Sequence, residues 1–353
     1  MYDRGKKYTP GALRIGLYLL LSGLIAACGP GVLEGTAPTP PLPTAAVILN
    51  TAEPTAAPTN PPTATQIPTA LPNPSATPVP QPWRFVVLGD TRTSGLKPPE
   101  ITYTIVERAT QAEPEITLAV GDMIFALDTQ PEVRQQWRFW RQAVAPLQPS
   151  QADSEPWLLV TPGNHDVQGH DWATDLLVEA FPELPTNGPA GFARRTYAVD
   201  YRGVRFISLD SESRDEVHLL NDAQLVWLER QLRDNPNRYT IVFSHDPAYP
   251  VGPHLGSSLD VYPQARDRLW RLLRDYKATA YIAGHEHLYN HQQIDGVHQI
   301  IAGTSGSYVY GGYGGEFYHY VVGEVGANEL AFVVYDEQGA ERDRFAVPAR
   351  DAT

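Results

Sequence analysis

Five short polar segments of this sequence carry the residue types of a metal site. Each follows a run of apolar residues, and four of them begin with glycine. Carboxylate oxygens, amide oxygens and neutral imidazoles bind divalent metals at about 2.0–2.2 Å, and two ions ~3.5–4 Å apart can share one carboxylate. This inventory predicts a two-metal hydrolytic site. The predicted ligands are Asp90, Asp122, Asn164, His245, His285 and His287.

The apolar runs before these segments have the composition of buried parallel strands. They cover residues 85–88, 116–120, 157–160, 239–243 and 280–283. The carboxyl ends of parallel strands meet at one edge of an open α/β sheet, where successive loops converge on one crevice. We therefore expect the five polar segments to meet at one point.

The remaining pattern alternates strands with helices. Expected helices cover residues 99–111, 131–144, 221–233 and 263–276, and an antiparallel hairpin pairs residues 195–200 with 204–209. Three further β segments, 297–302, 318–325 and 330–335, are expected to close the domain as a meander. The order predicts an α/β fold of two packed mixed β-sheets flanked by helices.

The individual motifs differ in how strongly each one indicates a metal site. A lone Gly-Asp after a strand is usually a turn or a helix cap. In an extended segment His285 and His287 would face one side while Glu286 turns to the other, which suits a pair of metal ligands. The glycines would let backbone approach the site closely. The ordered set is therefore stronger evidence for a metal site than any single motif.

From residue 83 to 348 the order of these motifs resembles the calcineurin-like metallophosphoesterase superfamily, which includes the purple acid phosphatases. The resemblance implies a four-layer αββα sandwich, two divalent or trivalent ions (Fe, Mn or Zn), and attack of a metal-bound hydroxide on a phosphate ester. It implies that His165 protonates the leaving oxygen and that Asp166 orients His165. Asp90, Asp122 and His287 would bind the first metal; Asp122, Asn164, His245 and His285 would bind the second.

The first motif departs from the pattern of that superfamily. Most members have Asp-x-His, whose histidine binds the first metal, whereas Arg92 stands here. Purple acid phosphatases have a tyrosine three residues after the bridging aspartate, and here that position is Phe125. Arginine stays protonated and cannot bind a metal. Either Arg92 binds substrate phosphate, or it forms a salt bridge with a nearby carboxylate; the first metal site could also be empty.

Two further residues are candidates for substrate binding. Tyr249 and His254 follow His245 in a stretch that resembles the His-x-Pro-x-Tyr segment of acid phosphatases. Tyr249 could equally serve only for packing. The segment 303–318, rich in Gly and Tyr, is expected to form a loop over the crevice.

The first 28 residues predict a lipoprotein signal peptide. A basic start and an apolar core precede Leu24-Ile25-Ala26-Ala27-Cys28, which resembles a bacterial lipobox, and Cys28 is the only cysteine. An uncleaved membrane anchor is the alternative. Residues 29–82, rich in Pro, Thr and Ala, predict a disordered linker. We expect an extracytoplasmic protein anchored to the membrane through lipidated Cys28.

The sequence has a net charge of −13 and no basic stripe, so nucleic acid is not an expected partner. A phosphorylated small molecule or another phosphate ester is the expected substrate. The leading hypothesis is a phosphomonoesterase. The alternatives are a phosphodiesterase of the same fold and a non-catalytic surface module that binds metal or phosphate.

Overall fold

The computed structural model describes residues 81–150, 156–214 and 216–350. The predicted signal peptide with Cys28 and nearly all of the predicted linker lie outside these residues. Within these three ranges, every helix is too short or too polar to cross a lipid bilayer.

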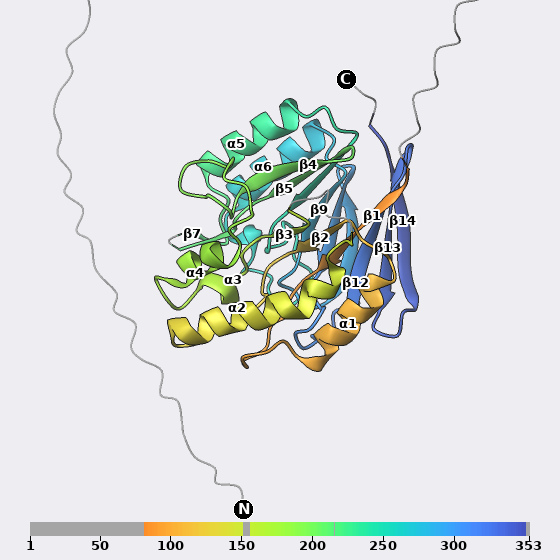
Figure 1. The fold of residues 1–353 in the computed structure, drawn as a ribbon. Coiled ribbons are helices and arrows are strands. Elements are labelled where there is room, and N and C mark those ends of the chain that lie inside the picture. Colours follow the sequence, from red (N-terminus) through yellow and green to blue (C-terminus); the bar gives the residue numbers. More distant parts are fainter. Residues whose placement is uncertain (1–80, 151–155, 215, 351–353) are drawn as a thin grey trace, which may run out of the picture. The chain divides into compact units, whose positions relative to one another are not determined.

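Two six-stranded mixed sheets form the centre of the described body (Figure 1). The first sheet has the order β14 (Glu341–Pro348), β13 (Glu329–Asp336), β12 (His319–Val325), β1 (Trp83–Leu88), β2 (Ile116–Ala119) and β3 (Leu158–Val160). The second has the order β10 (Tyr289–Ile294), β11 (Val297–Ala302), β9 (Ala280–Ala283), β8 (Tyr239–Phe243), β5 (Val204–Ser208) and β4 (Tyr197–Tyr201). The predicted α/β fold with two mixed sheets is confirmed.

The strands that lead to the polar segments run parallel to their neighbours. In the first sheet β1, β2 and β3 pair in parallel, and in the second sheet β8 pairs in parallel with β5 and β9. Their side chains are buried almost throughout, as the apolar runs predict. The two sheets face each other: the ring of Phe85 on β1 contacts that of Phe206 on β5, with centroids 5.4 Å apart. The carboxyl ends of both sets of strands therefore approach each other.

Helices cover the outer faces of the sheets (Figure 1). On one side lie α1 (Glu100–Thr110) and α2 (Gln130–Val144), which place Ile105 and Trp140 in the main core. On the other side lie α5 (Asp222–Arg233) and α6 (Pro263–Asp275), which bury Leu228 and Leu269 against the second sheet. Helix α5 begins as expected after Asn221, whose side chain accepts a hydrogen bond from the amide of Gln224 at 3.1 Å.

The expected terminal meander is partly wrong. Strands β12, β13 and β14 do form an antiparallel meander, but β11 belongs to the second sheet, where it pairs in parallel with β9. A tight turn at Asp295-Gly296, with φ of 50° and 85°, pairs β11 with β10 and so brings it into that sheet. This Asp-Gly pair is a hairpin signal, and it shows why β10 belongs to the fold although no strand was expected there.

Candidate active site

Asp90 and Asp122 lie directly beyond β1 and β2, at the edge where the sheets meet. Both are buried and both adopt a left-handed backbone, with φ of 50° and 52°. Non-glycine residues in this region carry local strain and are concentrated at functional sites. A Cβ on Gly284 would lie 2.3 Å from Asp90 Oδ2, and a Cβ on Gly163 would lie 2.4 Å from Asp122 Oδ1. Glycine at these two positions is therefore needed for the backbone to pass so close to the carboxylates.

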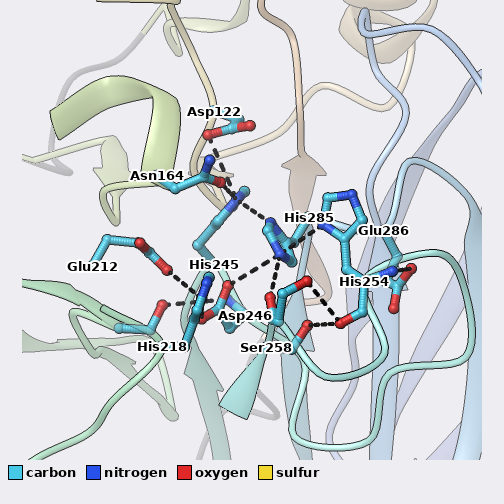
Figure 2. A network of polar contacts seen from close by, with 12 residues as sticks. Asp122, Asn164, Glu212, His218, His245, Asp246, His254, Ser258, His285 and Glu286 are labelled. Carbon is cyan, nitrogen blue, oxygen red and sulfur yellow. Dashed lines mark hydrogen bonds and ion pairs between the residues drawn. The ribbon is translucent and has the colours of Figure 1, made fainter. Parts of the chain in front are cut away.

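The four residues predicted to bind the second metal lie together, with His245 at the centre (Figure 2). The Nδ1–H of His245 donates to the carbonyl of Val120 at 2.9 Å, which leaves Nε2 as a lone-pair donor. Asn164 Oδ1 lies 3.1 Å from that Nε2, His285 Nδ1 lies 3.1 Å away, and Asp122 Oδ1 lies 3.5 Å away. Ligands about 2.1 Å from one ion are roughly 3.0–3.4 Å apart, so this spacing fits a bound metal.

The tautomer of His285 supports this arrangement. Its Nε2–H donates to the carbonyl of Ser257 at 2.9 Å, so its Nδ1 presents a lone pair toward His245 Nε2. Two imidazole lone pairs 3.1 Å apart repel each other unless a cation lies between them. The donor set therefore requires a positive charge at this point. Burial opposes a charge on His245, but Asp122 and Asp90 outweigh it and raise the pKa of the ring, so a proton takes this place when no metal is bound.

The ligands predicted for the first metal also come together. One oxygen or nitrogen from each of Asp90, Asp122 and His287 lies within 4.8 Å of the others. His287 Nε2 is 3.3 Å from Asp90 Oδ1, and both atoms are buried without a hydrogen-bond partner. Burial raises the pKa of Asp90 well above its usual value. A cation at this position would compensate the buried carboxylate, so these residues also fit a metal ion.

The two histidines of the last motif reach the site by a different route from the one expected. Strand β9 ends at Ala283, and His285 and His287 have φ of 70° and 45°. The prediction of an extended segment is therefore wrong, although both rings still point to the site. The left-handed backbone at His285 and His287 directs both imidazoles to the same side. The carboxylate of Glu286, between them, accepts a hydrogen bond from the amide of His254 instead.

Arg92 forms a salt bridge with the shared ligand Asp122. Its Nε donates to Asp122 Oδ2 at 2.8 Å, and the two side chains are 11% and 1% exposed. Burial opposes ionisation of Asp122, but the nearby His245, His165 and Arg92 outweigh it and lower the pKa of the carboxyl. Within the described residues the two terminal nitrogens of Arg92 make no hydrogen bond. The salt-bridge alternative is thus what the structure contains, and it leaves the outer face of the guanidinium free.

His165 lies beside Asp122 and is half-buried. Its backbone amide donates to Asp122 Oδ1 at 2.9 Å, and its ring stacks on Phe125 with centroids 4.7 Å apart. The guanidinium carbon of Arg92 also lies over the Phe125 ring, 5.8 Å from the ring centroid. Burial lowers the pKa of His165 to about 4, although Asp122 acts in the opposite direction. The imidazole is therefore neutral at neutral pH and presents one N–H.

The expected partnership of Asp166 with His165 is wrong. Asp166 Oδ1 accepts hydrogen bonds from the amides of Met123 and Ile124, both at 2.9 Å, and Oδ2 accepts one from Gly163 at 2.9 Å. Both oxygens are therefore engaged by backbone. Asp166 joins the segment after β2 to the segment after β3, and so positions Asp122 and Asn164 rather than the imidazole.

The two residues predicted to bind substrate have different surroundings. Tyr249 packs edge-on against Trp270 of α6, with centroids 4.9 Å apart, and lies under Arg266. It packs against the outer core, as the alternative predicts, and its contact with substrate stays a prediction. His254 does lie at the site: its Nδ1 is 2.7 Å from His285 Nε2, and its Nε2 is 3.2 Å from the hydroxyl of Tyr310. Both of its ring nitrogens are engaged by the protein.

Sequence reasoning missed several residues that complete the site. The carbonyl of Tyr308 accepts from His287 Nδ1 at 3.0 Å, which frees His287 Nε2, and the ring of Tyr310 stacks on that of His287. The indole of Trp140 donates to Thr91 Oγ1 at 2.8 Å and fixes the segment between Asp90 and Arg92. The tyrosines belong to the segment 303–318, which was expected over the site without specific roles. No pattern in the sequence links Trp140 to Thr91.

Known proteins resemble parts of this chain. It is 28% identical over 145 residues to a probable glycerophosphodiester phosphodiesterase GpdQ of Arcobacter nitrofigilis, which covers 36% of this chain and 44% of the relative. It is 31% identical over 100 residues to the tartrate-resistant acid phosphatase type 5 of Oryctolagus cuniculus, which covers 28% of this chain and 29% of the relative. The aligned regions therefore span less than half of these curated relatives.

Solved structures share the fold. The purple acid phosphatase PPD1 of yellow lupin (Lupinus luteus) superposes with a TM-score of 0.57 at 17% identity, covering 76% of this chain and 54% of that one. GAP50 of Plasmodium, described as the anchor in the inner membrane complex, superposes with a TM-score of 0.54 at 14% identity, covering 76% and 90%. The model of the calcineurin-like phosphoesterase family matches residues 84–289, which include all six predicted ligands. The chain belongs to the calcineurin-like phosphoesterase family.

Proposed function

We propose that this protein is a metal-dependent phosphoesterase that hydrolyses phosphomonoesters. The observation that carries the proposal is the set of three ligand atoms that surround His245 Nε2 at 3.1–3.5 Å: Asn164 Oδ1, His285 Nδ1 and Asp122 Oδ1. Asp90 and His287 add a second, adjoining set. Divalent ions at these residues would polarise a phosphoryl oxygen and lower the pKa of water to near neutrality.

The residues of the chain have distinct tasks around such a substrate. Arg92 is fixed through its Nε to Asp122, so its two terminal nitrogens can bind two phosphoryl oxygens as a fork. His165, held by Phe125, would place its N–H at the leaving oxygen. Asp166 keeps the segments that carry Asp122 and Asn164 in register. Tyr310 and His254 hold the rings of His287 and His285.

Arg92 supports a monoester rather than a diester substrate. A phosphomonoester carries two negative charges near neutral pH and a diester carries one, so a buried guanidinium beside the metal site gains more from the monoester. The alternative, a phosphodiesterase, is supported by the resemblance to two proteins named glycerophosphodiester phosphodiesterase, one from Arcobacter nitrofigilis and one from Enterobacter lignolyticus. A non-catalytic binding module is the third candidate, but it has no use for His165 beside Asp122.

We further propose that the protein acts outside the cytoplasm, anchored through a lipid on Cys28. The supporting observations are the basic and apolar start of the sequence and the position of its only cysteine before the Pro-rich segment. Metabolic labelling with a radioactive fatty acid tests this placement: wild type should be labelled and Cys28→Ser should not. Label retained on Cys28→Ser would refute it.

The function is tested by comparing two substrates. The full chain, loaded with Zn²⁺ or Mn²⁺, should hydrolyse p-nitrophenyl phosphate faster than its bis-ester, and EDTA should abolish both reactions. Arg92→Lys keeps the positive charge but loses the fork, so it should lower kcat/KM for the monoester by more than for the diester. A faster reaction with the bis-ester would favour the phosphodiesterase. Bound metal without hydrolysis of either ester would favour the binding module.

A further inference from the structure

A second polar cluster adjoins the candidate active site and has no part in the proposed reaction. It consists of Glu212 in β6 (Glu212–Ser213), His218 just after β7 (Glu216–Val217), and Asp246, which follows His245. Figure 2 shows the three beside His245 and His285. The side chains of Glu212 and Asp246 are fully buried, and that of His218 is 19% exposed.

The hydrogen bonds within the cluster do not satisfy its oxygens. His218 Nδ1 lies 2.8 Å from Asp246 Oδ2 and 3.2 Å from Glu212 Oε1, but a single N–H can serve only the nearer oxygen well. Gln168 donates to Glu212 Oε2 at 2.9 Å. Glu212 Oε1 and Asp246 Oδ1 are then left buried without a hydrogen-bond partner. Leaving such a buried acceptor unsatisfied costs about 1–3 kcal/mol, and more for a charged group.

Two buried carboxyl groups of the cluster also share a single imidazole nitrogen. Oxygens of Asp246 and Glu212 lie on the same side of His218, 2.8 Å and 3.2 Å from its Nδ1. A divalent cation between the two carboxyl groups would serve the buried oxygens that the imidazole leaves without a partner.

We propose that Glu212, His218 and Asp246 bind a third divalent cation. Two carboxylates and an imidazole form a mixed oxygen and nitrogen set, which suits Zn²⁺. Ligand atoms of His218, Asp246 and His285 lie within 4.8 Å of one another, and His285 Nε2 is 3.8 Å from Asp246 Oδ1. The ring of His285 therefore separates this cation from the metal held by His245. The cation would brace the segments that carry His245 and His285, and the proposal does not depend on turnover.

The proposal is tested by zinc content. Full-length wild type and variants are saturated with Zn²⁺, dialysed, and measured by inductively coupled plasma mass spectrometry. Glu212→Gln and His218→Gln should each hold one zinc ion fewer per chain than wild type. His291→Gln is the matched control: its side chain is 20% exposed, it lies 3.6 Å from Asp343, and it belongs to neither metal cluster, so its zinc content should equal that of wild type.

A second measurement needs no variant. Anomalous diffraction from Zn²⁺-loaded crystals should show a peak between the carboxylates of Glu212 and Asp246, separate from any peak at Asp122. The proposal is overturned by the absence of that peak, and equally by variants that keep the zinc content of wild type while their circular dichroism is native. In either case, Glu212, His218 and Asp246 would form a buried ion triad with water and without a metal. Loss of hydrolysis without loss of this zinc would count only against the proposed function.

Discussion

Replacing Arg92 by alanine should destabilise the metal-free protein far more than the metal-loaded one. Arg92 Nε is 2.8 Å from Asp122 Oδ2, and the two side chains are 11% and 1% exposed. Removing one partner of a buried ion pair costs about 3–5 kcal/mol, because the other charge is left uncompensated. Since Arg92 retains some exposure, we expect a loss of about 3 kcal/mol in the free energy of unfolding when metal is absent.

Bound metal should reduce this loss. A cation on Asp122 compensates the carboxylate that Arg92 leaves behind, so only the packing of the guanidinium on Phe125 is lost, about 1 kcal/mol. The difference of about 2 kcal/mol must also be a difference in metal affinity. By linkage, Arg92→Ala should therefore bind metal roughly 30-fold more tightly than wild type.

The assay is urea unfolding followed by circular dichroism, once in EDTA and once in saturating Zn²⁺, with isothermal titration calorimetry for the affinity. Arg134→Ala is the control, because its pair with Glu179 is exposed, with side chains 44% and 56% accessible, and its unfolding midpoint should not change. Equal destabilisation of Arg92→Ala in both conditions, or none in EDTA, would show that Arg92 does not compensate Asp122.

Three further predictions concern residues around the site. Asp166→Asn places an NH₂ group against backbone amides that now donate to a carboxylate oxygen. Urea unfolding should therefore show a loss of about 1–3 kcal/mol in the free energy of unfolding. An unchanged free energy of unfolding would show that Asp166 does not hold the two segments together. Gly284→Ala places a Cβ 2.3 Å from Asp90 Oδ2, so the metal content per chain should fall in mass spectrometry, and an unchanged content would mean that the Asp90 segment can move aside. Tyr249→Phe keeps the packing on Trp270, so kcat and KM for p-nitrophenyl phosphate should stay within about twofold of wild type; a large rise in KM would return Tyr249 to the substrate site.

Residue types and strand ends were enough to predict which side chains meet. Asp90, Asp122, Asn164, His245 and the pair His285 and His287 stand in five separate segments, yet each segment follows a buried strand, and parallel strands bring their carboxyl ends together. The fold class followed from the same alternation of strands and helices. For these features the local pattern and the global topology agree, so the sequence could be interpreted directly.

The failures have a common physical cause in backbone geometry that side-chain types do not reveal. Asp166 looks like a partner for its neighbour His165, but the left-handed turn at Asp122 directs the amides of Met123 and Ile124 to its carboxylate. His285 and His287 reach the site through left-handed residues rather than a strand.

The second cluster could not be predicted because its members come from unrelated segments. Glu212 and His218 follow β5, and Asp246 follows β8, with no spacing that marks them as a set. Only the pairing of β5 with β8 in the second sheet brings them together.

The most direct test of the central claim is the hydrolysis of p-nitrophenyl phosphate by metal-loaded Asp122→Asn. This change keeps the shape of the side chain but removes the charge shared by the two sets of ligands. We predict that kcat/KM falls by at least ~10³-fold while circular dichroism stays native, a loss of about 4 kcal/mol in transition-state stabilisation. A variant that keeps kcat/KM within tenfold of wild type would contradict a reaction centred on Asp122.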